Sequence, residues 1–212
     1  MLHDPAYLEV KKAIMSGAIR PGATITIRAM AAALGTSPMP VRESLSCLVA
    51  ERALVMLPTR SVTVPLMRAE QFDEISRIRI AMEGMVAEKA TTLLNSETLR
   101  QMQQAQIEMS RLKPQHTSVY LAKKQGLHFT LYRAARMPVA MQMIESLWLQ
   151  AGPLLNLALS EISFRSGQDH HRALLEALEK RSIKAARSAI EADITDAARI
   201  IREFLATASS TG

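Results

Sequence analysis

The sequence predicts a mainly α-helical protein in which a winged helix-turn-helix is followed by an all-α bundle of six antiparallel helices. Three observations predict this fold class. Hydrophobic residues make up 48% of the 212 residues but aromatic residues only 4%, which favours packed helices over sheets. Residues 34–55 have the spacing of a helix-turn-helix. After Pro65 the apolar pattern is helical to the end of the chain.

The helix-turn-helix pattern centres on Gly35, where one helix ends and another begins directly behind Ser37. Ser37 suits an N-cap, and Pro38 and Pro40 fall in the first turn, where a missing amide hydrogen costs little. The inner face is apolar at helical spacing, with Val41, Leu45, Leu48 and Val49. The outer face carries Met39, Arg42, Ser46 and Cys47. An arginine near the start of a second helix is typical of helices that enter the DNA major groove.

The flanking segments complete a first domain over residues 1–65, and residues 66–212 form the second. We expect a helix at 6–17 with Leu8, Ile14 and Met15 inward, a short strand at 23–25, and a helix at 27–34 capped by Thr26. Two short apolar segments, 54–57 and 62–64, predict a hairpin, or wing, with Arg60 at its tip.

The second domain is predicted to contain six helices, and polar residues interrupt three of their apolar faces. The expected helices are 69–94, 96–112, 117–136, 139–159, 167–180 and 182–207, with one break around Ser163–Ser166 and a kink at Pro153. The inward stripes hold Leu121, Lys124, His128, Leu131 and Ala135; His171, Leu174, Leu175 and Leu178; and Ala186, Ile190, Asp193, Ala197, Ile201 and Phe204. Taken singly, each polar residue is compatible with a hydrogen-bond partner close by or with a position at a solvated helix end. Together, His128, His171 and Asp193 favour one ligand or metal site inside the bundle.

Charge and cysteine content limit the class of protein. With 26 Lys and Arg against 20 Asp and Glu, the net charge of +6 suits a polyanionic partner. The single Cys47 excludes an internal disulfide and is compatible with a reducing compartment. We find no signal peptide and no apolar run of the roughly 18 residues that span a bilayer. A cytoplasmic protein with no membrane partner is expected.

Four segments carry a resemblance to a known family. Gly17-Ala-Ile-Arg-Pro-Gly22 and Leu34-Gly-Thr-Ser-Pro-Met-Pro-Val-Arg-Glu-Ser-Leu45 resemble the DNA-binding signature of the GntR regulators. Arg79-Ile-Ala-Met-Glu-Gly84 and His171-Arg-Ala-Leu-Leu-Glu-Ala-Leu178 resemble elements of the ligand-binding FCD domain of the FadR branch. The resemblance covers residues 6–207. It implies a ligand-responsive regulator, most often a repressor, that binds a double-stranded DNA operator as a homodimer and a small effector, an organic acid, in its bundle.

The resemblance also implies which residues contact DNA. They are Arg28, Ser37, Pro38, Met39, Arg42, Thr59, Arg60 and Ser61. Pro38 stands where many members have an arginine that can read guanine, so the operator sequence of those members does not carry over. Ser61 replaces the usual wing glycine, which puts a close approach of the wing to the minor groove in question.

A divalent metal is the family property from which this chain departs most. Many FCD domains bind such an ion, for example zinc, nickel or manganese, with one Asp and three His. The four positions here read Lys124, His128, His171 and Asp193 with the family's spacing. Two arrangements are possible. In the first, His128, His171 and Asp193 still form a facial metal site. In the second, Lys124 pairs with Asp193, no metal binds, and Lys124 and Arg79 receive an anionic effector. We favour the metal-free arrangement.

Two other functions are compatible with parts of the sequence. A two-His-one-carboxylate set can bind iron, so a metal-dependent enzyme is the alternative function. No nucleophile motif or Gly-rich cofactor loop accompanies the set, and an enzyme of this kind would leave the winged domain unexplained. A non-specific architectural DNA-binding protein conflicts with the modest net charge and the large helical domain.

Overall fold

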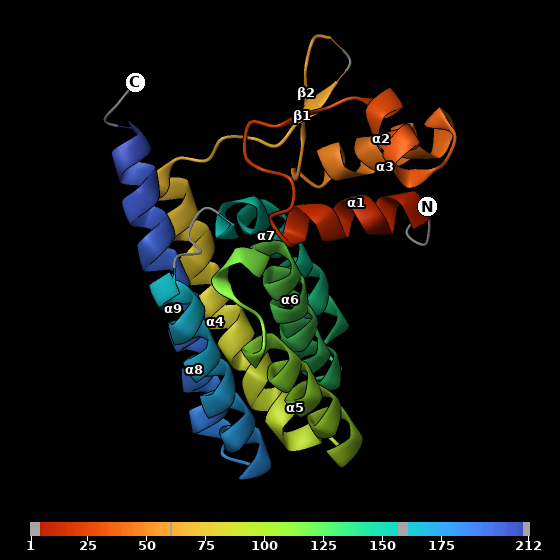
Figure 1. Cartoon of the computed structure of the whole chain (residues 1–212). Helices are drawn as coiled ribbons and strands as arrows, with labels where there is room; N and C mark the ends of the chain where they lie inside the picture. Colours follow the sequence, from red (N-terminus) through yellow and green to blue (C-terminus); the bar gives the residue numbers. More distant parts are fainter. Residues whose placement is uncertain (1–4, 60, 157–160, 210–212) are drawn as a thin grey trace.

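The computed structural model describes residues 5–59, 61–156 and 161–209, and it confirms the mainly helical architecture (Figure 1). Its N-terminal part contains the helices α1 (Pro5–Met15), α2 (Ile27–Leu34) and α3 (Pro38–Ala50). The bundle contains α4 (Ala69–Leu93), α5 (Ser96–Ser110), α6 (Thr117–Ala134), α7 (Pro138–Leu155), α8 (Glu161–Glu179) and α9 (Ile183–Ser209), with the short 3-10 helix η1 (Pro114–His116) before α6.

A small antiparallel sheet completes the N-terminal part. It consists of β1 (Thr24–Ile25), β2 (Val55–Met56) and β3 (Val62–Thr63) in the spatial order β1-β3-β2. Val62 lies opposite Ile25 on one side and Met56 on the other. Because Val62 and Ile25 are both buried, the hairpin of β2 and β3 is anchored to the core of the domain at its base. This hairpin is the predicted wing.

The bundle consists of long helices that pack side by side (Figure 1). Helix α4 runs along α9, and α9 also packs against α8. Helix α5 contacts both α6 and α8, while α7 packs on α4. Trp148 of α7 and Tyr132 of α6 are among the largest side chains that are fully buried. They lie where the polar residues predicted on the inner faces also meet.

Helix α1 connects the two parts, since it packs on α3 and also on α7 and α6 (Figure 1). At the end of α1 the backbone approaches Gly152 so closely that a Cβ atom there would lie 2.6 Å from the carbonyl oxygen of Met15. The side-chain amide of Asn156 donates a hydrogen bond of 3.0 Å to the carbonyl of Gly17, whose φ is +69°. Lys11 and Glu145 form an ion pair of 2.6 Å across the same joint.

Four sequence-based expectations were wrong in detail. Leu8 and Phe204 were expected to face inward, but they are 47% and 41% exposed. The expected break at Ser163–Ser166 lies inside α8, which begins at Glu161 and not at residue 167. The helix expected over 139–159 ends at Leu155, and positions 157–159 lie outside the described residues. Pro153 lies within this helix as expected.

Candidate DNA-binding and effector sites

Local sequence chemistry positions the recognition helix. The hydroxyl of Thr26 accepts a hydrogen bond of 3.2 Å from the amide of Ala29 and caps α2. Gly35 ends α2 in the left-handed conformation, with φ of +62°. Helix α3 then begins at Pro38, where the missing N–H needs no partner, although the Ser37 side chain makes no capping hydrogen bond. The two helices therefore meet at a tight turn.

Most of the residues expected to contact DNA are exposed. The exposed ones are Arg28, Ser37, Pro38, Met39, Arg42 and Thr59. Val41, Leu45 and Leu48 of α3 are buried, which directs the opposite face outward. Ser61 departs from the expected pattern because it is only 8% exposed and shares a hydrogen bond of 2.7 Å with the Thr59 hydroxyl. Arg60 lies outside the described residues.

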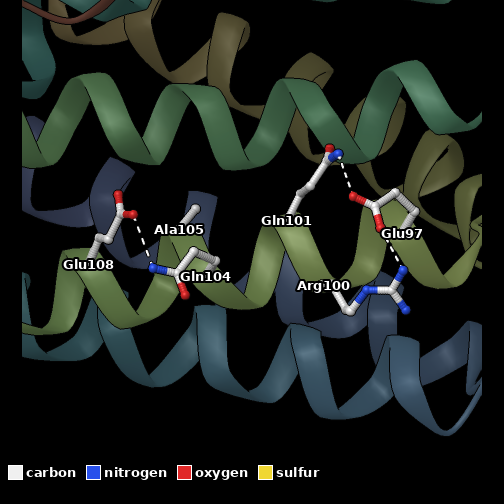
Figure 2. A pocket seen from close by; sticks show the side chains of 6 residues that line it. All are labelled: Glu97, Arg100, Gln101, Gln104, Ala105 and Glu108. Carbon is white, nitrogen blue, oxygen red and sulfur yellow. Dashed lines mark hydrogen bonds and ion pairs between the residues drawn. The ribbon is translucent and has the colours of Figure 1, made fainter.

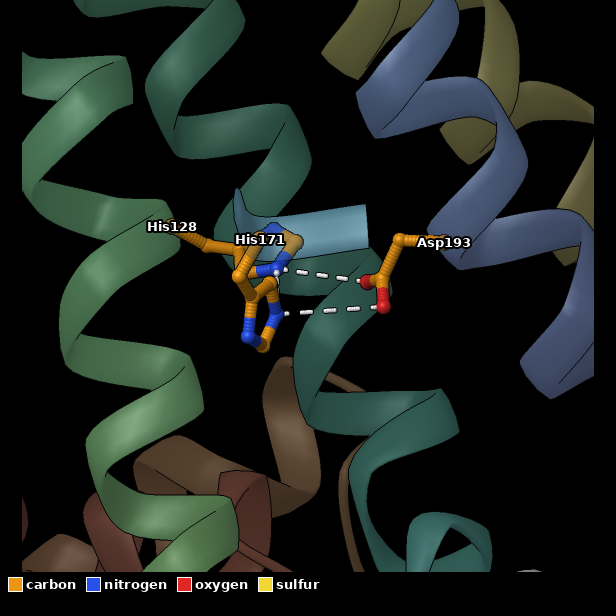
Figure 3. Close-up of side chains that lie close together, drawn as sticks. All are labelled: His128, His171 and Asp193. Carbon is orange, nitrogen blue, oxygen red and sulfur yellow. Dashed lines mark hydrogen bonds and ion pairs between the residues drawn. The ribbon is translucent and has the colours of Figure 1, made fainter. Parts of the chain in front are cut away.

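The four polar positions singled out in the bundle converge in its interior. Lys124 and His128 project from α6, His171 from α8 and Asp193 from α9, and all four are buried. The Lys124 ammonium lies 2.7 Å from Asp193 Oδ1, and His128 Nε2 lies 3.3 Å from Asp193 Oδ2. The facing Nε2 atoms of His128 and His171 are 3.4 Å apart (Figure 3). Asp193 is thus the common partner of the cluster.

Burial and charge set the protonation of this cluster. Burial alone would raise the pKa of Asp193, but the Lys124 ammonium and the hydrogen bond to His128 outweigh it and hold that pKa well below its usual value. Burial lowers the pKa of His171 to about 3, so its ring is neutral near pH 7. Its Nδ1 atom is buried without a hydrogen-bond partner among the described residues. A buried unpartnered nitrogen is a place where a ligand atom gains a hydrogen bond.

A second buried ion pair lies beside the cluster and was missed by the sequence analysis. Glu83 has no exposed surface and accepts hydrogen bonds from Arg79, from the Tyr132 hydroxyl at 2.5 Å and from the Trp148 indole at 3.1 Å. The Arg79 guanidinium also lies 4.5 Å from the centroid of the Trp148 ring. Burial alone would lower the pKa of Arg79, but the charge and hydrogen bonds of Glu83 raise it. The spacing of Arg79 and Glu83, one turn apart, was the available signal.

The residues of the cluster do not fit the metal ion that many FCD domains hold. His128, His171 and Asp193 do offer three donor atoms within 4.8 Å of one another. However, an ion on the carboxylate oxygen paired with Lys124 would lie about 4–5 Å from the ammonium, where repulsion is roughly 7 kcal/mol at an effective dielectric constant of about 20. The ammonium already neutralises the carboxylate, so the cluster needs no further cation.

One surface depression carries no comparable chemistry. It runs along α5 and is lined by Glu97, Arg100, Gln101, Gln104, Ala105 and Glu108. Figure 2 shows that these side chains bond to one another along the helix: Arg100 and Gln101 donate to Glu97, and Gln104 donates to Glu108. Pairs at this spacing are ordinary on solvated helix faces, and we assign no function to this one.

A winged helix-turn-helix joined to a bundle with a buried polar cluster defines a DNA-binding regulator that responds to a ligand. The profile "Bacterial regulatory proteins, gntR family" matches residues 2–64, and the FCD domain profile matches residues 74–196. The chain belongs to the GntR family of transcriptional regulators, in the branch with an FCD effector-binding domain. As a GntR regulator it binds DNA through the winged domain, and its FCD domain binds a small-molecule effector.

Individual relatives agree with this assignment. The HTH-type transcriptional regulator McbR of Escherichia coli (strain K12) is 30% identical over 183 residues, which cover 84% of this chain and 83% of McbR. The solved structure of E. coli McbR/YncC superimposes with a TM-score of 0.87 at 27% identity and covers 94% of this chain and 96% of that one. A GntR regulator from Rhodococcus sp. RHA1 shares the fold, with a TM-score of 0.73 at 21% identity over 92% and 94% of the two chains.

The families and relatives are transcriptional regulators and not enzymes, and none of them supports the metal-dependent enzyme alternative. Among the residues that the structure describes, no helix has the length and apolar character needed to cross a membrane.

Proposed function

We propose that this regulator represses transcription as a homodimer that places two winged domains on a pseudo-palindromic operator. Each winged domain ends near Pro65. The observation that carries the proposal is the exposed outer face of α3, where Met39 is 62% exposed and Arg42 is also exposed. Ile78 and Met85 support dimerisation, because they lie two turns apart on α4 and each remain 41% exposed. An apolar stripe of this kind is a natural contact for a second copy.

Contacts with DNA are assigned to the exposed residues Arg28, Ser37, Pro38, Met39, Arg42 and Thr59, together with Arg60, which the sequence predicts at the wing tip. We place Ser61 behind them, as the residue that orients Thr59 through their shared hydrogen bond. Arg28 and Arg42 are the cations of the group on the helix-turn-helix, and they serve base edges or phosphates. Pro38 contributes shape and not hydrogen bonds, because it has no donor.

Arg42→Ala is expected to weaken binding to the DNA fragment upstream of the protein's own gene by tenfold or more, about 1.4 kcal/mol. A gel-shift titration at fixed salt measures this, and light scattering of the complex tests for two chains per operator. Arg199→Ala is the matched control, because Arg199 is an exposed arginine on α9 that pairs with Glu203. Equal losses in the two variants would show that only net charge matters and would refute the assignment of Arg42.

The effector is proposed to be a small organic acid that binds the buried cluster of Lys124, His128, His171 and Asp193. A carboxylate can replace Asp193 as the partner of Lys124, and the unpartnered Nδ1 of His171 offers a further hydrogen bond. Arg79 remains paired with Glu83, which neutralises its charge, so Lys124 is the cation that receives the carboxylate. Thermal melting with a panel of small carboxylates tests the idea, and a panel in which no acid raises the melting temperature counts against it.

The metal-free arrangement makes a separate prediction. Protein purified without chelator is expected to hold far less than one metal ion per chain. The double variant Lys124→Asp, Asp193→His restores the family's donor set and should bind about one zinc or nickel ion per chain. Elemental analysis after gel filtration measures both. Asp193→His alone is the control, because Lys124 then remains in place. Stoichiometric metal in the unaltered protein would overturn the arrangement.

A further inference from the structure

A cleft lies between the winged domain and the bundle, away from the buried cluster. Its volume is about 540 Å³, and its walls come from α1 on one side and from α6 and α7 on the other. Helix α6 separates the two sites, since Lys124 and His128 project into the bundle while Gln125 and Phe129 line the cleft. The volume falls in the range of small-molecule sites.

Part of the cleft is apolar and incompletely filled. Leu8 lines it and is 47% exposed, which accounts for the failure of its predicted burial. Tyr7 and Phe129 contribute buried aromatic walls. Gly126 also lines the cleft, and a Cβ atom built there would have no neighbour within 4 Å. A glycine in the middle of a helix weakens it, so open space beside Gly126 is consistent with a function that keeps the cleft wide.

The charges around the cleft favour an anion. Lys11 and Glu145 neutralise each other through their ion pair of 2.6 Å. Lys12 and Arg133 also line the cleft, and the part of the chain that the structure describes gives neither of them an ion-pair partner. The Arg133 guanidinium lies 5.8 Å from the centroid of the Phe129 ring, which places a cation at the edge of the apolar wall. Two uncompensated cations beside an apolar surface match a molecule with one acidic group and an apolar body.

We propose that this interdomain cleft binds a small organic anion with an aromatic or aliphatic body. The apolar body lies against Leu8, Phe129 and the open face at Gly126, and the acidic group lies between Lys12 and Arg133. This site is distinct from the effector site in the bundle. Because α1 belongs to the winged domain and α6 and α7 to the bundle, an occupant contacts both and restrains their relative motion.

A pair of dyes tests the proposal. The anion 8-anilinonaphthalene-1-sulfonate has the required charge and aromatic body, and N-phenyl-1-naphthylamine is its neutral counterpart. We expect saturable binding of the anion to the full-length protein, with the neutral dye bound at least about tenfold more weakly. Gly126→Trp fills the cleft and should weaken binding of the anion at least about tenfold, while Gly126→Ala should leave it within about twofold of the unaltered protein.

Further variants locate the charge and separate this site from the others. Arg133→Gln should weaken binding of the anionic dye several-fold and leave binding of the neutral dye unchanged. The double variant Lys124→Met, Asp193→Asn removes both charges of the buried pair in the bundle. This variant and Arg42→Ala on α3 should leave binding of the anionic dye unchanged, so that failure of the proposed DNA and effector sites does not affect the outcome. The proposal is overturned if Gly126→Trp binds the anion as the unaltered protein does, if both dyes bind equally, or if the double variant in the bundle abolishes binding.

Discussion

Replacement of Gly152 by alanine is expected to lower the free energy of unfolding by about 3 kcal/mol. A Cβ atom at this position would lie 2.6 Å from the carbonyl oxygen of Met15 and 2.7 Å from its Cα atom. Both are backbone atoms of the segment that ends α1, so no side chain can rotate away. Either α1 shifts and the ion pair between Lys11 and Glu145 is strained, or α7 shifts within the core. Urea denaturation followed by circular dichroism measures the loss.

Gly126→Ala is the matched control for this experiment. Gly126 lies in the middle of α6, and a Cβ atom there meets nothing within 4 Å. The same substitution should therefore leave stability unchanged or raise it by up to about 1 kcal/mol through higher helix propensity. If Gly152→Ala is as stable as Gly126→Ala, the close contact between α1 and α7 does not exist in solution.

Glu83→Gln is expected to cost about 3–5 kcal/mol of stability, because it leaves the charge of Arg79 buried without a counter-charge. The two side chains are 6% and 0% exposed, so water cannot replace the lost partner. Glutamine keeps the size of the side chain and an oxygen for Tyr132 and Trp148, which confines the change to the charge. Denaturation curves again provide the measurement.

The double variant Arg79→Met, Glu83→Gln tests the reason for that loss. Removing both charges avoids the uncompensated guanidinium, so the double variant should be more stable than Glu83→Gln alone. A single variant that costs less than about 1 kcal/mol, or a double variant less stable than the single one, would show that the ion pair is not the main contribution of Glu83.

The winged domain was predictable because its signals are local. The cap at Thr26, the left-handed Gly35 and the proline at the start of α3 each fix the backbone over a few residues. The inner face of α3 also followed from periodicity alone. The wing followed from two short apolar segments around a turn, and its register with β1 required the structure.

The errors have two causes: periodicity gives the faces of a helix but not what covers them, and local propensity does not fix where a helix begins. Leu8 lies on the apolar side of α1 but faces the cleft and not a packed neighbour. The early start of α8 shows tertiary context overriding weak helix formers. Gly167, the first residue of the helix expected over 167–180, is helical, and a Cβ atom there would lie 2.7 Å from the Tyr120 hydroxyl. Here the small residue serves packing.

In the bundle, the sequence identified Lys124, His128, His171 and Asp193 as one group, and the structure brings them together. The pairing of Lys124 with Asp193 was one of two arrangements left open by the spacing. Glu83 lies in the segment Arg79–Gly84 but was not singled out, because an arginine and a glutamate one turn apart do not reveal in the sequence whether the pair is buried or solvated. Only the positions of Tyr132 and Trp148, distant in sequence, reveal that it is buried.

Helix α7 gives the protein a very short route between its two halves. Trp148 packs against His128, with ring centroids 5.6 Å apart, and Gly152 touches the end of α1. The two residues are four positions apart, about 6 Å along the helix axis. We therefore expect a ligand that displaces the indole to shift the contact between α7 and the end of α1 through one turn of one helix, with no chain of intervening side chains between them. Communication between the effector site and the winged domain would then depend on how α7 packs against α1.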